Sequence, residues 1–92
     1  MERMNELIST AGNTEAPAYL TILSKGYSIK STEISHESIY IATKNLIEFR
    51  SDSMTGVLGL ISIREIRGEN WKASDSEINE FMKIFYPNSN NE

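Results

Sequence analysis

The longest apolar segment of the chain reads Asp52-Ser-Met-Thr-Gly-Val-Leu-Gly-Leu-Ile-Ser-Ile-Arg-Glu-Ile-Arg-Gly-Glu-Asn-Trp71. Residues that favour helix ends stand on both sides of its apolar part: Ser51, Asp52 and Ser53 before it, and Arg64, Arg67 and Gly68 after it. A strand over residues 57–63 is the competing interpretation, because this run is apolar and contains β-branched residues. The caps and a length of about 13 residues favour the helix.

Apolar residues are distributed around the axis of this predicted helix. At about 100° per residue they form no single stripe, so we expect a mostly buried, central helix; they are Val57, Leu58, Leu60, Ile61 and Ile63. Gly56 and Gly59 each cost about 1 kcal/mol relative to Ala in a helix interior, which predicts that another element, most simply a sheet, packs closely there. Either the core surrounds the helix, or a homodimer or partner contact completes its burial.

Before this segment the pattern predicts one helix and three strands. The helix begins near Thr14, carries a stripe of Ala16, Tyr19, Leu20 and Leu23, and ends at Gly26. Strands follow over residues 27–34, 38–43 and 46–50, joined by polar turns at 35–37 and 44–45. With Thr43 opposite Leu46, one sheet face carries Tyr40, Ala42, Ile47 and Phe49, and the other carries Ile39, Ile41 and Leu46.

The last predicted helix has the clearest local signals. Ser74 and Glu77 have the spacing of a capping box, and Pro87 ends the helix. Its apolar residues recur at i, i+3, i+4 and i+7, as Ile78, Phe81, Met82 and Phe85. The sequence therefore predicts one α+β domain over residues 1–92, ordered α-β-β-β-α-α, with a small three-stranded antiparallel sheet and an amphipathic C-terminal helix. We expect residues 1–12 to be frayed and residues 88–92 to form a disordered tail.

Composition excludes several classes of function. The 92 residues carry a formal net charge of −4 without a basic run, which disfavours nucleic-acid binding. The absence of cysteine excludes disulfides and zinc thiolates. The N-terminus lacks a signal-peptide pattern, and no run reaches the roughly 18 to 20 apolar residues of a membrane span, so we expect a cytoplasmic protein.

No residue set predicts a chemical site. His36 is the single histidine and stands in a predicted turn without a Ser or Cys nucleophile motif. Lys30-Ser31-Thr32 resembles the end of a phosphate-binding loop, but Ile29 replaces the required glycine. We therefore predict no catalytic residue, no cofactor and no metal site.

Trp71 offers two interpretations. Its ring either fills the corner between the two C-terminal helices or forms a partly exposed anchor for another protein. The predicted partner-binding residues are Arg67, Asn70, Trp71, Lys72 and Tyr86.

Residues 57–61 and the sequence Arg67-Gly-Glu-Asn-Trp71, followed by a capped helix from Ser74, resemble a pattern of short uncharacterised bacterial proteins, in which a pair like Gly26-Tyr27 precedes the strands. The resemblance implies no activity. We expect a small non-enzymatic protein that binds another protein, as immunity proteins, toxin antagonists and regulatory subunits do. The alternatives are an obligate homodimer and a small enzyme with a site of Asp, Glu or Tyr residues.

Overall fold

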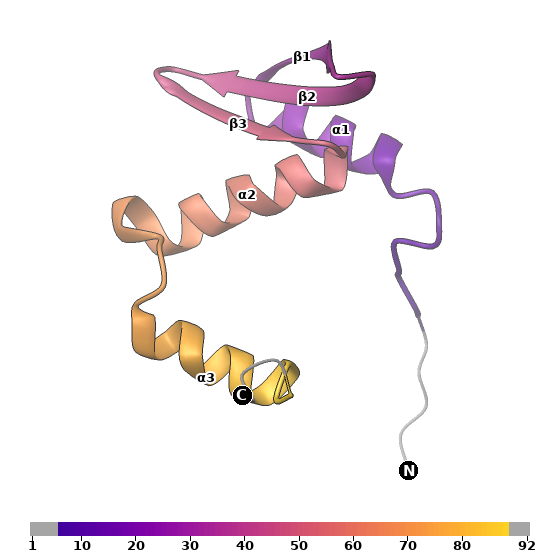
Figure 1. Cartoon of the computed structure of the whole chain (residues 1–92). Helices are drawn as coiled ribbons and strands as arrows, with labels where there is room; N and C mark the ends of the chain where they lie inside the picture. The colour runs from indigo at the N-terminus through magenta and orange to yellow at the C-terminus, as the bar shows by residue number, and fades with distance from the viewer. Residues whose placement is uncertain (1–5, 89–92) are drawn as a thin grey trace.

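A computed structural model describes residues 6–88 and shows three helices below a small sheet (Figure 1). The elements are α1 (Glu15–Ser24), β1 (Ser28–Ile34), β2 (Glu37–Lys44), β3 (Ile47–Ser51), α2 (Met54–Arg67), the short 3₁₀ helix η1 (Gly68–Asn70) and α3 (Asp75–Phe85). The predicted α+β class and the order α-β-β-β-α-α are confirmed.

The sheet is an antiparallel meander with strand order β1-β2-β3. Ser35 and His36 join β1 to β2, and their φ angles of 52° and 70° match the two-residue hairpin turn with positive φ at both positions. Asn45 has φ 58° in the turn before β3, as its tolerance of this conformation predicts.

The predicted register of β2 and β3 is wrong by two residues. Thr43 pairs with Glu48 rather than with Leu46, and Leu46 is a fully exposed turn residue. A shift of two residues leaves every side chain on the same face, because side chains alternate with a period of two. Ala42 and Phe49 are therefore still neighbours on one face, as predicted.

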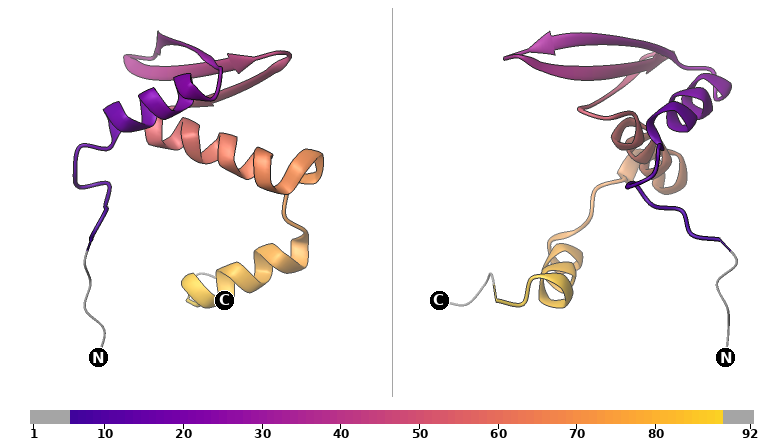
Figure 2. Two further views of the ribbon diagram at one scale, coloured as in Figure 1. Left: turned by 180° about the vertical axis from the view of Figure 1, so that it is seen from behind. Right: turned by 90° about the vertical axis from the view of Figure 1, so that its right-hand side faces the viewer.

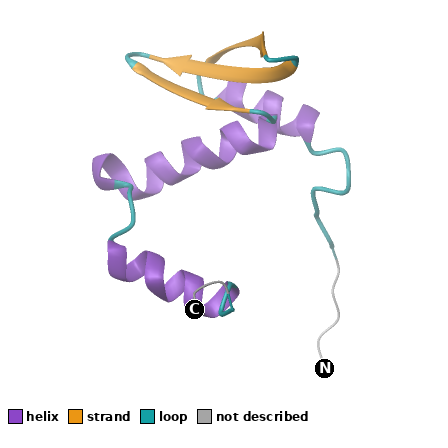
Figure 3. Ribbon diagram, in the orientation of Figure 1, coloured by secondary structure: helices purple, strands orange, loops and turns teal. Residues whose placement is uncertain are grey.

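The core lies between one face of the sheet and the helices α1 and α2 (Figure 2). Its buried residues are Ile22, Tyr27, Ala42, Val57 and Ile61. Tyr27 and Phe49 pack edge to face with their ring centroids 5.9 Å apart, which is a favoured aromatic geometry. Among the residues that the structure describes, no helix lies above the other face of the sheet (Figure 3).

The predicted apolar stripe of α1 is wrong. The helix buries Ala18 and Ile22, whereas Tyr19, Leu20 and Leu23 are exposed. The helix carries two apolar stripes, the wider predicted one and the narrower one that is buried. Which stripe is buried depends on the element that packs against the helix, and the local sequence pattern does not identify that element. Gly26 follows the helix with φ 93°, as predicted.

The helical interpretation of the central segment is confirmed, but its predicted burial is wrong. Ser53 caps α2 by accepting a hydrogen bond of 2.9 Å from the backbone N–H of Gly56, and Gly68 follows it with φ 80°. Only Val57 and Ile61 are buried, while exposed apolar side chains remain at Leu60, Ile63 and Ile66. The sheet and α1 cover one side of α2, and within residues 6–88 no second layer covers the other.

The close packing predicted at the helix glycines occurs at one of them. A Cβ atom on Gly56 would lie 2.1 Å from Ser51 Oγ, whereas one on Gly59 would meet nothing within 4 Å. The end of β3 therefore requires glycine at position 56, and no described residue requires it at position 59.

The helix α3 is formed but is not packed into the domain. Ser74 and Glu77 make both hydrogen bonds of the predicted capping box, yet α3 has no buried residue. It lies on the side of α2 that faces away from the sheet (Figure 1). At the other end, residues 6–14 contain no helix, and residues 1–5 and 89–92, which include most of the predicted frayed and disordered ends, lie outside the described residues.

Candidate functional site

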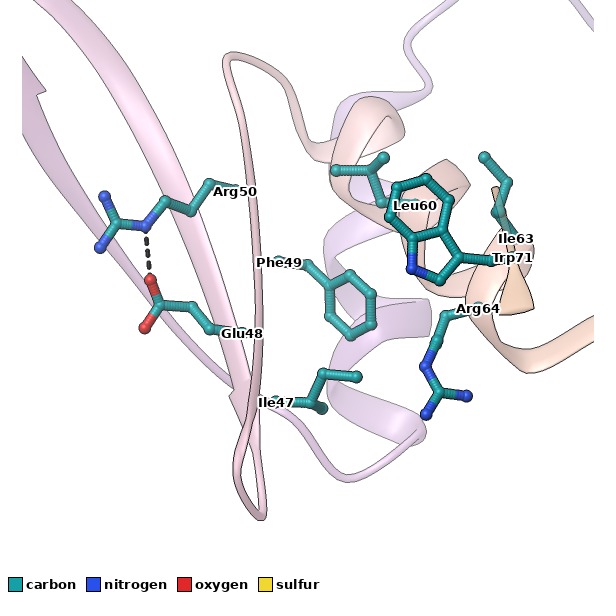
Figure 4. Close-up of a pocket in the computed structure, with 8 residues that line it drawn as sticks. All are labelled: Ile47, Glu48, Phe49, Arg50, Leu60, Ile63, Arg64 and Trp71. Atoms are coloured by element: carbon teal, nitrogen blue, oxygen red, sulfur yellow. Dashed lines mark hydrogen bonds and ion pairs between the residues drawn. The ribbon is translucent and has the colours of Figure 1, made fainter. Parts of the chain in front are cut away.

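A hollow of about 310 Å³ opens between β3 and α2, and we call it the β3/α2 groove (Figure 4). This volume is at the lower limit of the roughly 300 to 1,000 Å³ of small-molecule sites. The groove is lined by Ile47, Glu48, Phe49, Arg50, Leu60, Ile63, Arg64 and Trp71.

The repeat of side-chain directions along β3 and along α2 places apolar side chains of both elements in the groove. Ile47 and Phe49 alternate along β3 and point toward α2, whereas Glu48 and Arg50 point to the opposite side, where Arg50 Nε donates to the Glu48 carboxylate (Figure 4). Leu60, Ile63 and Arg64 lie at i, i+3 and i+4 on one face of α2. The groove is therefore apolar at its centre, with a guanidinium group from Arg64 at its edge.

Trp71 lines one side of the groove, with its ring beside Leu60 and Ile63 (Figure 4). Its exposed fraction is 44%, which fits the interpretation of a partly exposed ring better than that of a ring filling the corner between the two C-terminal helices. The 3₁₀ helix η1 redirects the chain after α2, and Arg67 Nε donates a 2.7 Å hydrogen bond to the Trp71 carbonyl. This bond fixes the backbone of Trp71 beside the end of α2.

Four of the five predicted partner-binding residues come together at the junction of α2 and α3. Asn70, Trp71 and Lys72 line one shallow hollow with Glu69, and Lys72 Nζ lies 5.7 Å from the centroid of the Trp71 ring. Arg67 contacts the same segment through the Trp71 carbonyl. Tyr86 lies apart from them, because it follows the C-terminal end of α3, about 16 Å of helix away.

Sequence reasoning missed the other residues of the groove. Phe49 and Ile63 come from segments that were assigned to the core by their apolar character alone. The apolar surplus of α2 was a signal that some of its residues remain uncovered, but it did not indicate which ones, because that depends on where the sheet packs.

The second exposed apolar surface is the face of α3. Phe81 and Phe85 have exposed fractions of 51% and 63%, and their ring centroids lie 5.1 Å apart. The Tyr86 ring lies 6.0 Å from that of Phe81 and extends the cluster. Ile78 and Ile84 are also exposed on this helix.

Two carboxylates have lowered pKa values, and both act at helix N-termini. The pKa of Glu15 is below its usual value because its carboxylate accepts hydrogen bonds of 2.7 Å and 3.1 Å from the backbone N–H groups of Met54 and Thr55. The pKa of Glu77 is lowered mainly by the backbone N–H of Ser74. The first contact joins the start of α1 to the start of α2, and the second belongs to the cap of α3.

Residues 6–88 contain no cluster of three or more His, Cys, Asp or Glu side chains that could hold a metal ion. Over the same residues, no helix has the length and apolar character required to cross a bilayer. What the arrangement offers is two uncovered apolar surfaces, the β3/α2 groove and the face of α3.

No family model matches the chain, and neither a curated protein nor a solved structure matches it significantly.

Proposed function

We propose that this chain is a small non-enzymatic protein that binds another protein, in the manner of an immunity protein, a toxin antagonist or a regulatory subunit. The observation that carries the proposal is the state of α3, which is capped at its N-terminus and exposes its apolar face. A helix of 11 residues is marginal by itself in water, and packing of an apolar face normally stabilises it. A partner would supply that packing.

The chemistry of the exposed surfaces supports a protein partner. An amphipathic helix laid into an apolar groove is a recurrent mode of protein recognition. Contiguous exposed apolar surface commonly marks such interactions. We infer a cytoplasmic location for this binding.

Trp71 is the proposed anchor beside the helix. Tryptophan is enriched among the residues that dominate binding energy, and these residues sit in apolar hollows surrounded by polar groups. Trp71 meets this description, because it lines the same groove as Leu60 and Lys72 Nζ lies 5.7 Å from the centroid of its ring. Removal of its ring should weaken binding on the order of 30-fold or more.

Affinity capture from the native host, read by mass spectrometry, tests the proposal. The wild-type chain is compared with Trp71→Ala, Phe81→Ala and the control Leu46→Ala, which removes an exposed apolar turn side chain that does not line the groove. Circular dichroism and thermal unfolding first establish that every variant folds. We expect the wild type and Leu46→Ala to recover the same protein, which can include the chain itself, and the other two variants to lose it. Equal recovery by all four would contradict the proposal.

A further inference from the structure

We infer that the partner of these surfaces is a second copy of the chain, and that α3 of each copy lies in the β3/α2 groove of the other. This inference rests on the proposed function, because it names the partner of the same surfaces. The result would be a symmetric dimer with exchanged C-terminal helices.

The position of α3 indicates that it does not bind in the β3/α2 groove of its own copy. It lies beyond α2 from the sheet, whereas the groove lies between α2 and β3 (Figures 1 and 4). Only residues 71–73 and the cap Ser74 connect η1 to α3. The Arg67 guanidinium holds this connection at both ends, since Nε donates to the Trp71 carbonyl at 2.7 Å and Nη2 lies 3.9 Å from Glu77 Oε1. The connection directs α3 away from its own groove.

The two surfaces match in apolar character and in size. The apolar stripe of α3 runs from Ile78 to Phe85, about 10 Å along the helix axis, with Phe81 near its middle. The strand β3 is five residues long, about 17 Å, so the groove beside it is long enough for this stripe. Phe49 and Leu60 would contact the rings of a helix placed there.

Charge favours the same placement. At about 100° per residue, Asp75 and Glu77 lie on the two sides of the apolar stripe, and Lys83 lies on the opposite side of α3. The edge of the groove carries Arg64, which makes no ion pair with any residue in the described range. An acidic border on the helix would thus meet an unpaired guanidinium group.

The exposed area of the chain exceeds that of a compact monomer of the same mass. The chain exposes 7689 Å², whereas a compact monomer of 10.4 kDa is expected to expose about 5,400 Å². Even in the limit of full extension, the nine residues outside the described range would account for about 1,500 Å² of this surplus. About 800 Å² then remains, and it is shared among residues 6–13, which are all exposed, the helix α3 and the uncovered side of α2.

With two-fold symmetry, the exchange of helices is complete in a dimer. Each copy supplies one helix and one groove, so both apolar surfaces are used and neither remains open for a third chain. A foreign protein that offers its own groove would use α3 but would leave the β3/α2 groove uncovered. The second copy is the occupant that covers both.

Cysteine cross-linking of the full-length chain tests the exchange, because the chain has no cysteine of its own. Leu60→Cys and a longer, tagged Phe81→Cys chain are mixed and oxidised, with Leu46→Cys as the control for Leu60→Cys. We expect the mixed disulfide of Leu60→Cys with Phe81→Cys to form at least 10-fold more than that of Leu46→Cys with Phe81→Cys. Equal yields, or a chain carrying both Leu60→Cys and Phe81→Cys that closes within one monomer, would overturn the exchange.

Sedimentation over a dilution series then measures the strength of association. We expect Arg64→Glu and Asp75→Lys each to raise the dimer dissociation constant about 10-fold and their combination to restore it. Glu80→Lys, with the same change of charge on the opposite face of α3, should leave it unchanged. A wild-type chain that is monomeric throughout would overturn the inference. If such a monomer still captures a different protein through Trp71, the proposed function is retained and only the exchanged dimer is rejected. If it captures no protein, both the proposed function and the exchanged dimer are rejected.

Discussion

Gly56 lies where β3 ends and α2 begins, with Ser51 and the capping Ser53 directly beside it. The hydroxyl of Ser51 would be 2.1 Å and that of Ser53 2.9 Å from an added Cβ atom. Gly59, one turn later, faces open space. The same residue type in the same helix therefore has opposite consequences for stability.

We expect Gly59→Ala to stabilise the fold by up to about 1 kcal/mol, because alanine restricts the unfolded chain and favours the helix. Gly56→Ala should destabilise it on the order of 1 kcal/mol, because the methyl group displaces Ser51 and disturbs the cap bond from Ser53. Urea unfolding of both variants at one low protein concentration measures the two changes. Effects of the same sign would contradict the environments described for these glycines.

At the scale of elements, the contact between the starts of α1 and α2 depends on pH. Glu15 accepts from the backbone N–H groups of Met54 and Thr55 and from the Thr55 hydroxyl at 3.0 Å, so α1 provides the cap that α2 lacks at these positions. These bonds lower the pKa of Glu15 from the usual value of 4.5. A lowered pKa means that the contribution to stability is complete above pH 4.5 and is lost as the pH falls through the folded-state pKa.

Glu15→Gln should therefore be less stable than the wild type at pH 7, since a neutral amide is a weaker acceptor at a helix N-terminus. The difference between the two urea midpoints should shrink as the pH falls from 4.5 through the lower folded-state pKa, below which the wild-type carboxylate is protonated in the folded chain. Glu48→Gln is the matched control, because its carboxylate contacts Arg50 and no helix terminus. A difference that stays constant down to pH 2.5 would show that Glu15 acts by packing rather than by charge.

Element types followed from local signals, whereas burial did not. The helix α3 was predicted closely because Ser74, Glu77 and Pro87 act within one helical turn of their own positions. The stripe of α1 and the register of β3 were wrong because both depend on partners distant in sequence. The sequence allows Asn45 to stand at the beginning or at the end of the β2–β3 turn. The pairing of the two strands determines which position it takes and therefore sets the register. The groove could not be predicted from the local pattern either, because Phe49 and Leu60, which both line it, are 11 residues apart in the sequence.

At the scale of the whole molecule, the chain divides into a packed unit and an unpacked helix. Within residues 6–88, all buried residues lie between Ala18 and Ile61, so the core that these residues form between α1, the sheet and α2 is complete before η1. Lys25 Nζ pairs with Glu65 at 2.9 Å and joins the ends of α1 and α2 within this unit. The residues after Lys72 add no buried side chain within the described part of the chain.

We therefore expect a chain truncated after Lys72 to fold cooperatively, because it keeps every buried side chain and the Trp71 ring on the groove. Its thermal midpoint should not change with protein concentration. The midpoint of the full chain should rise with concentration, because dissociation accompanies unfolding when α3 is exchanged between copies. Scanning calorimetry of both chains over a 100-fold concentration range measures this difference. A concentration-independent midpoint for the full chain, together with a large loss of stability on truncation, would place α3 on its own core in solution and remove the basis for the exchanged dimer.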